Sequence, residues 1–218
     1  QPVILYQSSS PKKRTSLLGL ITLGIGFGGL LFSISPMLLA QLKYQTAKVI
    51  EPNNLVIKEV GQESNSINGF NLNIPKIQLN APVLANIDPY NEKEYQKSLK
   101  QGLAHAKGTG LPGQGKTIYI FGHSSSLIWD KNPYGTAFYL LGKLNKTDKI
   151  IITFNEKPYL YQVFEKKIME GNDFSLLNVG TKEKLVLQTC WPPASNWKRL
   201  VVIAEPLETL TLTQTYNP

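Results

Sequence analysis

The chain contains a single cysteine, Cys190, in the segment LVLQTCWPPASNWKRLVVIAEP. A lone thiol cannot form a disulfide within its own chain, so it is either a packed apolar residue or a reactive group. As a thiolate it would be a nucleophile, and a neighbouring imidazolium or guanidinium would favour that form. The residues able to supply such a neighbour are therefore the first to locate.

The chain has two histidines, His105 and His123, and so few candidates for a general base. His123 follows the strand-like run TIYIF and precedes three serines, which predicts a ring exposed at the end of a strand. His105 stands between two alanines at the end of a helical stretch, where a packed histidine is common. We therefore take His123 as the candidate base.

Arg199 precedes the apolar run 200–204, whereas Cys190 follows the apolar run 185–188. If these two runs are neighbouring strands joined by the Trp-Pro-Pro loop, both residues lie at one rim of the fold. An arginine donates hydrogen bonds and charge but no proton, which suits an oxyanion or a substrate carbonyl. The plainer alternative is an interstrand salt bridge or a solvated strand end.

The elements that must position these residues are short strands separated by turn signals. Strands are expected at 71–77, 81–85, 117–122, 149–154, 159–167, 185–188 and 200–204, and helices at 92–100 and 137–144. Pro75 predicts an edge or a break in the first strand, and the segment 155–158 predicts a hairpin turn. About eight short strands with few helices indicate a mainly β, closed or nearly closed barrel.

An uncharged stretch from Thr15 to Leu42 precedes this domain and is long enough for one membrane-spanning helix. A cleaved signal peptide would have a shorter apolar region. The basic triplet at 12–14 predicts a cytoplasmic N-terminus. We thus expect a cytoplasmic tail at 1–14, a signal anchor at 15–42, a linker at 43–69 and an extracellular domain at 70–218, on a single-pass plasma-membrane protein.

The net charge of +8 does not indicate a nucleic-acid partner, because three of the basic residues form that triplet and the others are scattered. The segment 108–113 fits G-x-G-x-x-G, but it contains a proline and precedes a strand, so it is interpreted as a loop. Paired metal ligands at short spacing are absent from the sequence. Neither a metal nor a cofactor is expected.

Taken together, the residues resemble the sortases, membrane-anchored cysteine transpeptidases of bacterial surfaces. Four segments carry the resemblance in family order: LNIPKIQLNAPV, LKQGLAHAKGTGLPGQG, TIYIFGHSS and LQTCWPPASNWKRLVV. The match extends from about Asn71 to Pro206. Val186 departs from the family pattern, in which a threonine usually stands at that position.

The resemblance implies an eight-stranded sortase barrel and a role for each matching residue. Cys190 would attack the carbonyl after the threonine of a C-terminal signal such as Leu-Pro-x-Thr-Gly and form a thioacyl enzyme. His123 would protonate the leaving amine and deprotonate the incoming one. Arg199 would bind the substrate backbone or stabilise the tetrahedral intermediate, and Thr189 would assist through its hydroxyl or its backbone.

Substrates would be surface proteins with such a signal, and the acceptor would be an amine of a cell-wall precursor or a pilin lysine. Trp191 and Trp197 would wall the substrate groove or pack in the loop. The interval between Cys190 and Arg199 is typical of class C, D or E sortases, although no lid motif precedes the barrel and Asp88-Pro89-Tyr90 is interpreted as a turn. Two alternatives remain: a hydrolytic thiol peptidase on the same fold, and a non-catalytic membrane-tethered binding domain.

Overall fold

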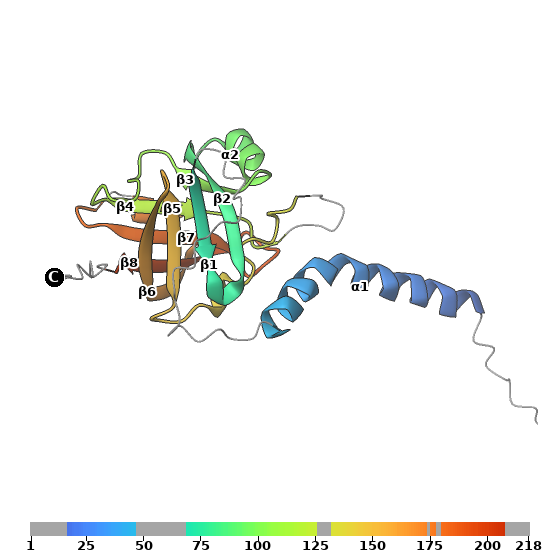
Figure 1. Ribbon diagram of the computed structural model, residues 1–218. Helices are drawn as coiled ribbons and strands as arrows, with labels where there is room; N and C mark the ends of the chain where they lie inside the picture. Colours follow the sequence, from blue (N-terminus) through green and yellow to red (C-terminus); the bar gives the residue numbers. More distant parts are fainter. Residues whose placement is uncertain (1–16, 47–68, 126–131, 174, 178–179, 208–218) are drawn as a thin grey trace, which may run out of the picture.

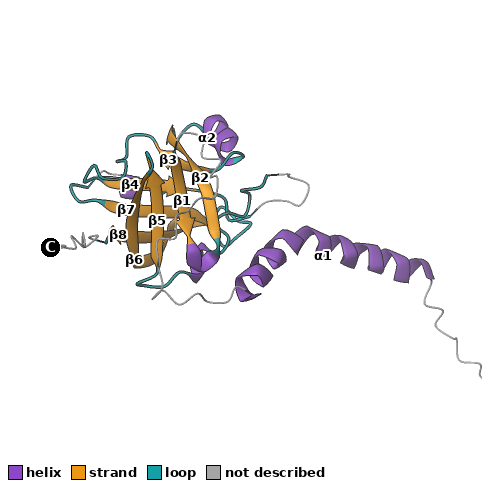
Figure 2. Cartoon of the chain, in the orientation of Figure 1, coloured by secondary structure: helices purple, strands orange, loops and turns teal. Residues whose placement is uncertain are grey.

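A closed barrel of eight strands lies between Phe70 and Pro206 (Figures 1 and 2). The computed structural model describes residues 17–46, 69–125, 132–173, 175–177 and 180–207. The strands are β1 (Phe70–Ile74), β2 (Leu79–Ile87), β3 (Leu103–Ala106), β4 (Thr117–Phe121), β5 (Lys149–Phe154), β6 (Lys157–Glu170), β7 (Lys184–Trp191) and β8 (Lys198–Pro206). They close in the order β1-β2-β3-β4-β7-β8-β6-β5, which confirms the predicted barrel.

Alternation along the strands separates a barrel interior from an outer face. In β7, Leu185 and Leu187 belong to the main core, whereas Val186 packs in a second cluster on the outer face. The same division holds in β4, where Ile120 faces the core and Tyr119 the outer cluster. Every second residue of these strands is therefore presented outside the barrel.

Two strand pairs are parallel, β2 with β3 and β4 with β7, and the other six pairs are antiparallel. The β4–β7 pair joins segments far apart in the chain, because Thr117 pairs with Lys184 and Phe121 with Gln188. The β7–β8 pair is a hairpin in which Cys190 is paired with Arg199. These two ladders bring the predicted functional segments onto adjoining strands.

Two local elements differ from the sequence prediction. The segment Leu103–Ala106 forms strand β3, whereas His105 was expected at the end of a helical stretch. Its alanines have low β-propensity, and its burial between β2 and β4 decides its conformation. The helix expected at 137–144 is also wrong: turns occupy this segment up to the 3₁₀-helix η3 (Leu141–Lys143).

The remaining local predictions agree with the structure. Pro75 ends β1 and begins the 3₁₀-helix η2 (Pro75–Ile77), and α2 (Glu92–Leu99) follows an N-cap at Asn91. The hairpin between β5 and β6 turns at Asn155 and Glu156, which both have positive φ as a tight two-residue turn requires. A third 3₁₀-helix, η4 (Ser175–Leu177), lies between β6 and β7.

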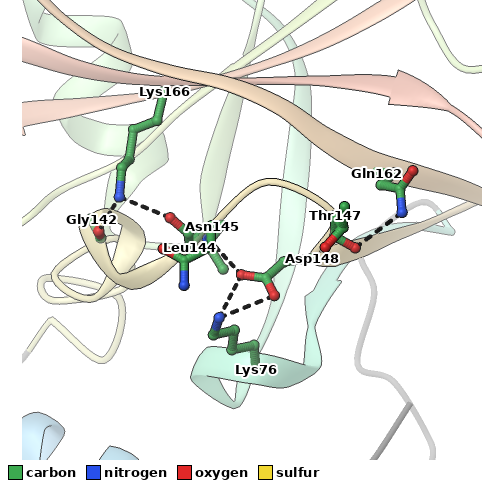
Figure 3. A network of polar contacts seen from close by, with 8 residues as sticks. All are labelled: Lys76, Gly142, Leu144, Asn145, Thr147, Asp148, Gln162 and Lys166. Atoms are coloured by element: carbon green, nitrogen blue, oxygen red, sulfur yellow. Dashed lines mark hydrogen bonds and ion pairs between the residues drawn. The ribbon is translucent and has the colours of Figure 1, made fainter. Parts of the chain in front are cut away.

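A polar network fixes the turn that leads into β5 (Figure 3). The Lys76 Nζ lies 2.8 Å from Asp148 Oδ2, which also accepts a 2.6 Å hydrogen bond from the Asn145 backbone. From β6, the Lys166 Nζ donates to the carbonyl oxygens of Gly142 (2.6 Å) and Leu144 (2.8 Å). The carbonyls of Gly142 and Leu144, at the end of η3, are thereby satisfied by a cation.

A long helix, α1 (Leu17–Thr46), precedes the barrel in the sequence. It covers most of the predicted span at 15–42 and continues beyond it. Within the described part of the chain, no helix meets the combined length and apolar character needed to cross a membrane. The membrane span therefore stays a prediction, and the predicted tail at 1–14 and most of the linker at 43–69 lie outside the described residues.

Candidate active site

Cys190 is presented on the outer face of the barrel. It lies two residues after Gln188 and four after Val186, which packs in the outer cluster, and alternation keeps the three on one side of β7. The thiol is half-buried. A partly exposed sulfur at a strand end is accessible to a substrate, as nucleophilic attack requires.

Arg199 is the direct cross-strand neighbour of Cys190 in the β7–β8 ladder. Directly opposed residues of an antiparallel pair have Cβ atoms about 5 Å apart on the same face. The guanidinium bends toward its own loop, because its Nη1 donates to the carbonyl oxygens of Asn196 (3.0 Å) and Lys198 (3.1 Å). These two bonds hold the cation on the loop that precedes β8.

His123 continues the β4 strand on the other side of Cys190. The ladder between β4 and β7 extends past the end of β4, since the Gly122 N–H donates to the Gln188 carbonyl at 3.1 Å. Each residue of β4 is paired with the residue 67 positions later, and the Thr189–Gly122 hydrogen bond keeps this offset. The same register carries His123 to the level of Cys190. Neighbouring strands lie about 4.8 Å apart, so by this register the backbone positions of residues 123, 190 and 199 form a row across three adjoining chain segments.

The loop between Cys190 and Arg199 is tied to the loop that follows His123. The Ala194 N–H donates a 2.9 Å hydrogen bond to the Ser125 Oγ, 69 residues away in the sequence. Within the loop, Ser195 donates to the Pro192 carbonyl from both its backbone N–H (3.1 Å) and its Oγ (2.8 Å). The two loops are therefore held together beside the ends of β4 and β7.

The second histidine is a structural residue. His105 is fully buried in β3, where its Nδ1 accepts a 3.2 Å hydrogen bond from the Asn86 N–H. Its Nε2 lies 2.9 Å from the Gly110 carbonyl oxygen, which fixes a neutral ring with the proton on Nε2. Burial lowers the pKa of His105 below its usual 6.5. Its two nitrogens are thus occupied inside the protein.

The three expected substrate-binding residues have different positions. Thr189 points into the barrel, is almost fully buried, and donates its hydroxyl hydrogen to the Gly122 carbonyl at 2.8 Å. Trp191 is half-buried and packs against the main core near Gly142 and Leu200. Trp197 is 75% exposed in the loop before β8. The Thr189 hydroxyl is therefore engaged inside the barrel, the Trp191 ring is partly packed on the core, and Trp197 is the most exposed of the three; a substrate-binding role for them stays a prediction.

Three further residues on the outer face were missed by the sequence reasoning. Tyr119 and Gln188 are joined by a hydrogen bond from the phenol to the Gln188 Oε1. Tyr95, on α2, packs edge-to-face on Phe121, with ring centroids 6.0 Å apart. The period-two alternation of TIYIF and LQTC could have placed Tyr119 and Gln188 beside Cys190, but no signal in the sequence places α2 against β4.

Tyr95 lies within electrostatic range of Cys190 and Arg199. Its pKa is raised, mainly by burial and then by the nearby Glu92 carboxylate. The charge of Arg199 opposes this rise and Cys190 adds to it. Both groups therefore influence the phenol.

In the described ranges, no group of three histidine, cysteine or acidic side chains is arranged to hold a metal ion.

An eight-stranded barrel with a cysteine, a histidine and an arginine at adjoining strand ends has the layout of a cysteine-dependent enzyme. The chain belongs to the sortase family, because the family model described as "Sortase domain" matches residues 72–207. This match covers all eight strands except the first two residues of β1.

Individual relatives agree with this assignment. Sortase D of Bacillus subtilis is 27% identical over 56% of this chain, which spans about half of that relative's length (53%). The pilus-related Sortase C of Group B Streptococcus is 30% identical with a TM-score of 0.55, over 67% of this chain and 70% of that one. Sortase A from Corynebacterium diphtheriae, a lid mutant, is 27% identical with a TM-score of 0.55, over 68% and 74%.

Proposed function

We propose that this protein is a transpeptidase that cleaves a C-terminal sorting signal of the Leu-Pro-x-Thr-Gly kind after its threonine and transfers the protein to an amine at the cell surface. The observation that supports the proposal is the register of β4, β7 and β8: Cys190 pairs with Arg199, and Phe121, two residues before His123, pairs with Gln188, two residues before Cys190. Membership of the sortase family supports the same chemistry.

The reaction would run in two halves. The Cys190 thiolate attacks the threonine carbonyl, a C–S bond forms, and the C–N bond to glycine breaks as His123 gives its proton to the leaving amine. The acceptor amine then attacks the thioester and loses a proton to His123, and the C–S bond breaks to restore the thiolate. Arg199 donates hydrogen bonds to the carbonyl oxygen on which charge develops.

Substitution of Cys190 provides the decisive test. The full chain in detergent is incubated with a sorting-signal peptide and a primary amine, and adducts and products are identified by mass spectrometry. We expect a thioacyl adduct on Cys190 and a ligated product, both lost in Cys190→Ala. Hydrolysed peptide alone would identify a thiol peptidase. No turnover and no adduct, with a folded Cys190→Ala variant, would leave a non-catalytic binding domain.

We also propose that α1 anchors the domain in the plasma membrane with the barrel outside the cell. Support comes from the absence of charged residues between Thr15 and Leu42 and from the solvent exposure of large apolar side chains on α1, among them Leu23 (73%) and Phe27 (61%). Flotation of the full chain with liposomes tests this directly. Recovery of the protein with the sedimented, lipid-free fraction would contradict the anchor.

A further inference from the structure

A polar pair interrupts an otherwise apolar stretch of the outer face, two residues before Cys190. Tyr119 is only 3% exposed, and its phenol donates a hydrogen bond to the Gln188 Oε1. Gln188 is half-buried and stands on the same side of β7 as the thiol. The proposed reaction uses neither residue, so the pair calls for a separate explanation.

The hydrogen bond from Tyr119 orients the carboxamide of Gln188. A phenol O–H can donate only to the amide oxygen, and this leaves the two N–H donors of Nε2 directed away from Tyr119. Burial raises the pKa of Tyr119, so the phenol remains a donor at neutral pH. Gln188 is thereby fixed as a hydrogen-bond donor toward its exposed side.

The ladder partners of this donor are apolar, while the charges of Arg199 and Asp173 act on its Tyr119 partner. Phe121 is its partner in the β4–β7 ladder, and Val201 is its partner in the β7–β8 ladder. Met169 of β6 and both Leu176 and Leu177 of η4 pack against the same outer cluster. A peptide that covers this face would take the amide out of water, which is favourable only if the peptide supplies an acceptor.

The spacing selects the part of the peptide that would meet Gln188. Two residues of a strand span about 7 Å, and two residues of an extended peptide span the same length. A peptide that lies along β7 in the parallel sense, with its scissile carbonyl at Cys190, brings Gln188 to the residue about two positions before the acylated one; the proposal takes this direction as its premise. In a Leu-Pro-x-Thr-Gly signal that residue is the proline, whose backbone offers an acceptor and no donor.

We propose that Gln188, oriented by Tyr119, is a substrate-binding residue that donates a hydrogen bond to the backbone carbonyl of the residue two positions before the acylated threonine. This inference rests on the proposed function, because it assumes that the peptide is acylated at Cys190. In this role the Tyr119–Gln188 pair selects peptides that have a backbone hydrogen-bond acceptor two positions before the acylated threonine.

The test combines an enzyme variant with a peptide variant. Gln188→Leu removes the donor, and an ester in place of the amide after the proline weakens the carbonyl as an acceptor. We expect Gln188→Leu to raise KM about threefold to tenfold with kcat changed less than twofold. Compared with the amide peptide, the ester peptide should show a KM raised by a similar factor with the wild type. With Gln188→Leu the two peptides should have nearly the same KM, as a direct contact requires.

Two further variants keep the result interpretable. Gln162→Leu is the matched control, because the Gln162 Nε2 donates to the Thr147 carbonyl at 3.2 Å (Figure 3) and Gln162 lies on β6 far along the strand from Met169, which pairs with Arg199. It should leave KM unchanged. Tyr119→Phe frees the amide to rotate, so we expect a smaller rise in KM; this variant and Gln188→Met replace Gln188→Leu if that protein does not fold.

The outcomes separate this inference from the proposed function. A wild type that forms no thioacyl adduct with the amide peptide would overturn the proposed function and with it the present assignment. A wild type that acylates normally, with a Gln188→Leu variant within twofold of its KM, would overturn the assignment alone. Equal losses from the ester in both enzymes would likewise exclude a contact between Gln188 and this carbonyl.

Discussion

The Thr189 Oγ1 donates a 2.8 Å hydrogen bond to the carbonyl oxygen of Gly122 inside the barrel. Thr189 directly precedes Cys190, and Gly122 directly precedes His123, so one buried bond joins the two residues that stand immediately before the proposed nucleophile and base. The backbone of β7 adds a second link, since the Gln188 carbonyl accepts from the Gly122 N–H at 3.1 Å. The backbone positions of Cys190 and His123 relative to each other are therefore set by hydrogen bonds of the residues that precede them, one of which lies inside the barrel.

Removing the Thr189 hydroxyl should lower the unfolding free energy, although the change in side-chain volume is small. Thr189→Val keeps the shape but leaves the buried Gly122 carbonyl without this partner, which costs about 1–3 kcal/mol of unfolding free energy. Chemical denaturation measures the loss. Thr189→Ser should restore most of it, and Thr153→Val, on the outward side of β5, is the control. A Thr189→Val protein as stable as the wild type would mean that the bond contributes nothing.

The hydrogen bond between Ser125 and Ala194 should matter for turnover rather than for global stability. Ser125→Ala releases the Cys190–Arg199 loop from the His123 loop, and we expect kcat to fall about threefold to tenfold, with the unfolding free energy little changed. Steady-state kinetics with a sorting-signal peptide measures this. Ser125→Thr retains the hydroxyl and should recover activity. Equal rates in Ser125→Ala and wild type would show that the tie does not position the site.

The two histidines should respond oppositely to the same substitution. His123→Ala should lower kcat/KM about 10²–10⁴-fold and leave the fold intact, since it removes a general acid–base. His105→Ala should leave kcat per folded molecule near the wild-type value and reduce the unfolding free energy by about 1–3 kcal/mol, because Asn86 and Gly110 lose a buried partner. Circular dichroism and acylation rates on both variants give the comparison. A reversed pattern would exchange the roles of the two rings.

His105 also predicts how stability depends on pH. Because its pKa in the folded protein lies below 6.5, the unfolded chain binds its proton first as the pH falls. Stability is therefore fully present above about pH 6.5 and declines below it, by up to about 1.4 kcal/mol per pH unit until the folded protein also takes up the proton. Urea titrations at pH 7.5, 6.0 and 5.0 should show a steeper decline for wild type than for His105→Gln. Identical slopes would exclude His105 as the source.

Much of the site followed from local sequence. The runs TIYIF and LVLQTC are rich in β-branched and apolar residues, and the hairpin-forming loop between Cys190 and Arg199 is short. These local features predicted β4, the end of β7, the start of β8 and one shared rim. The short strand β3 could not be predicted in this way, because the conformation of its small residues is decided by β2 and β4 on either side.

The sequence by itself determined which groups are available for chemistry: one thiol, two imidazoles and an arginine nine residues after the thiol. The sequence favoured His123 as the base, but only the tertiary structure showed that His105 is buried with both ring nitrogens engaged, because its burial in β3 depends on pairings with β2 and β4. The parallel β4–β7 ladder joins residues 67 positions apart, and no local periodicity encodes that register. The same ladder put Gln188 and Tyr119 beside Cys190, because side chains of adjoining strands on one face meet only after the barrel closes.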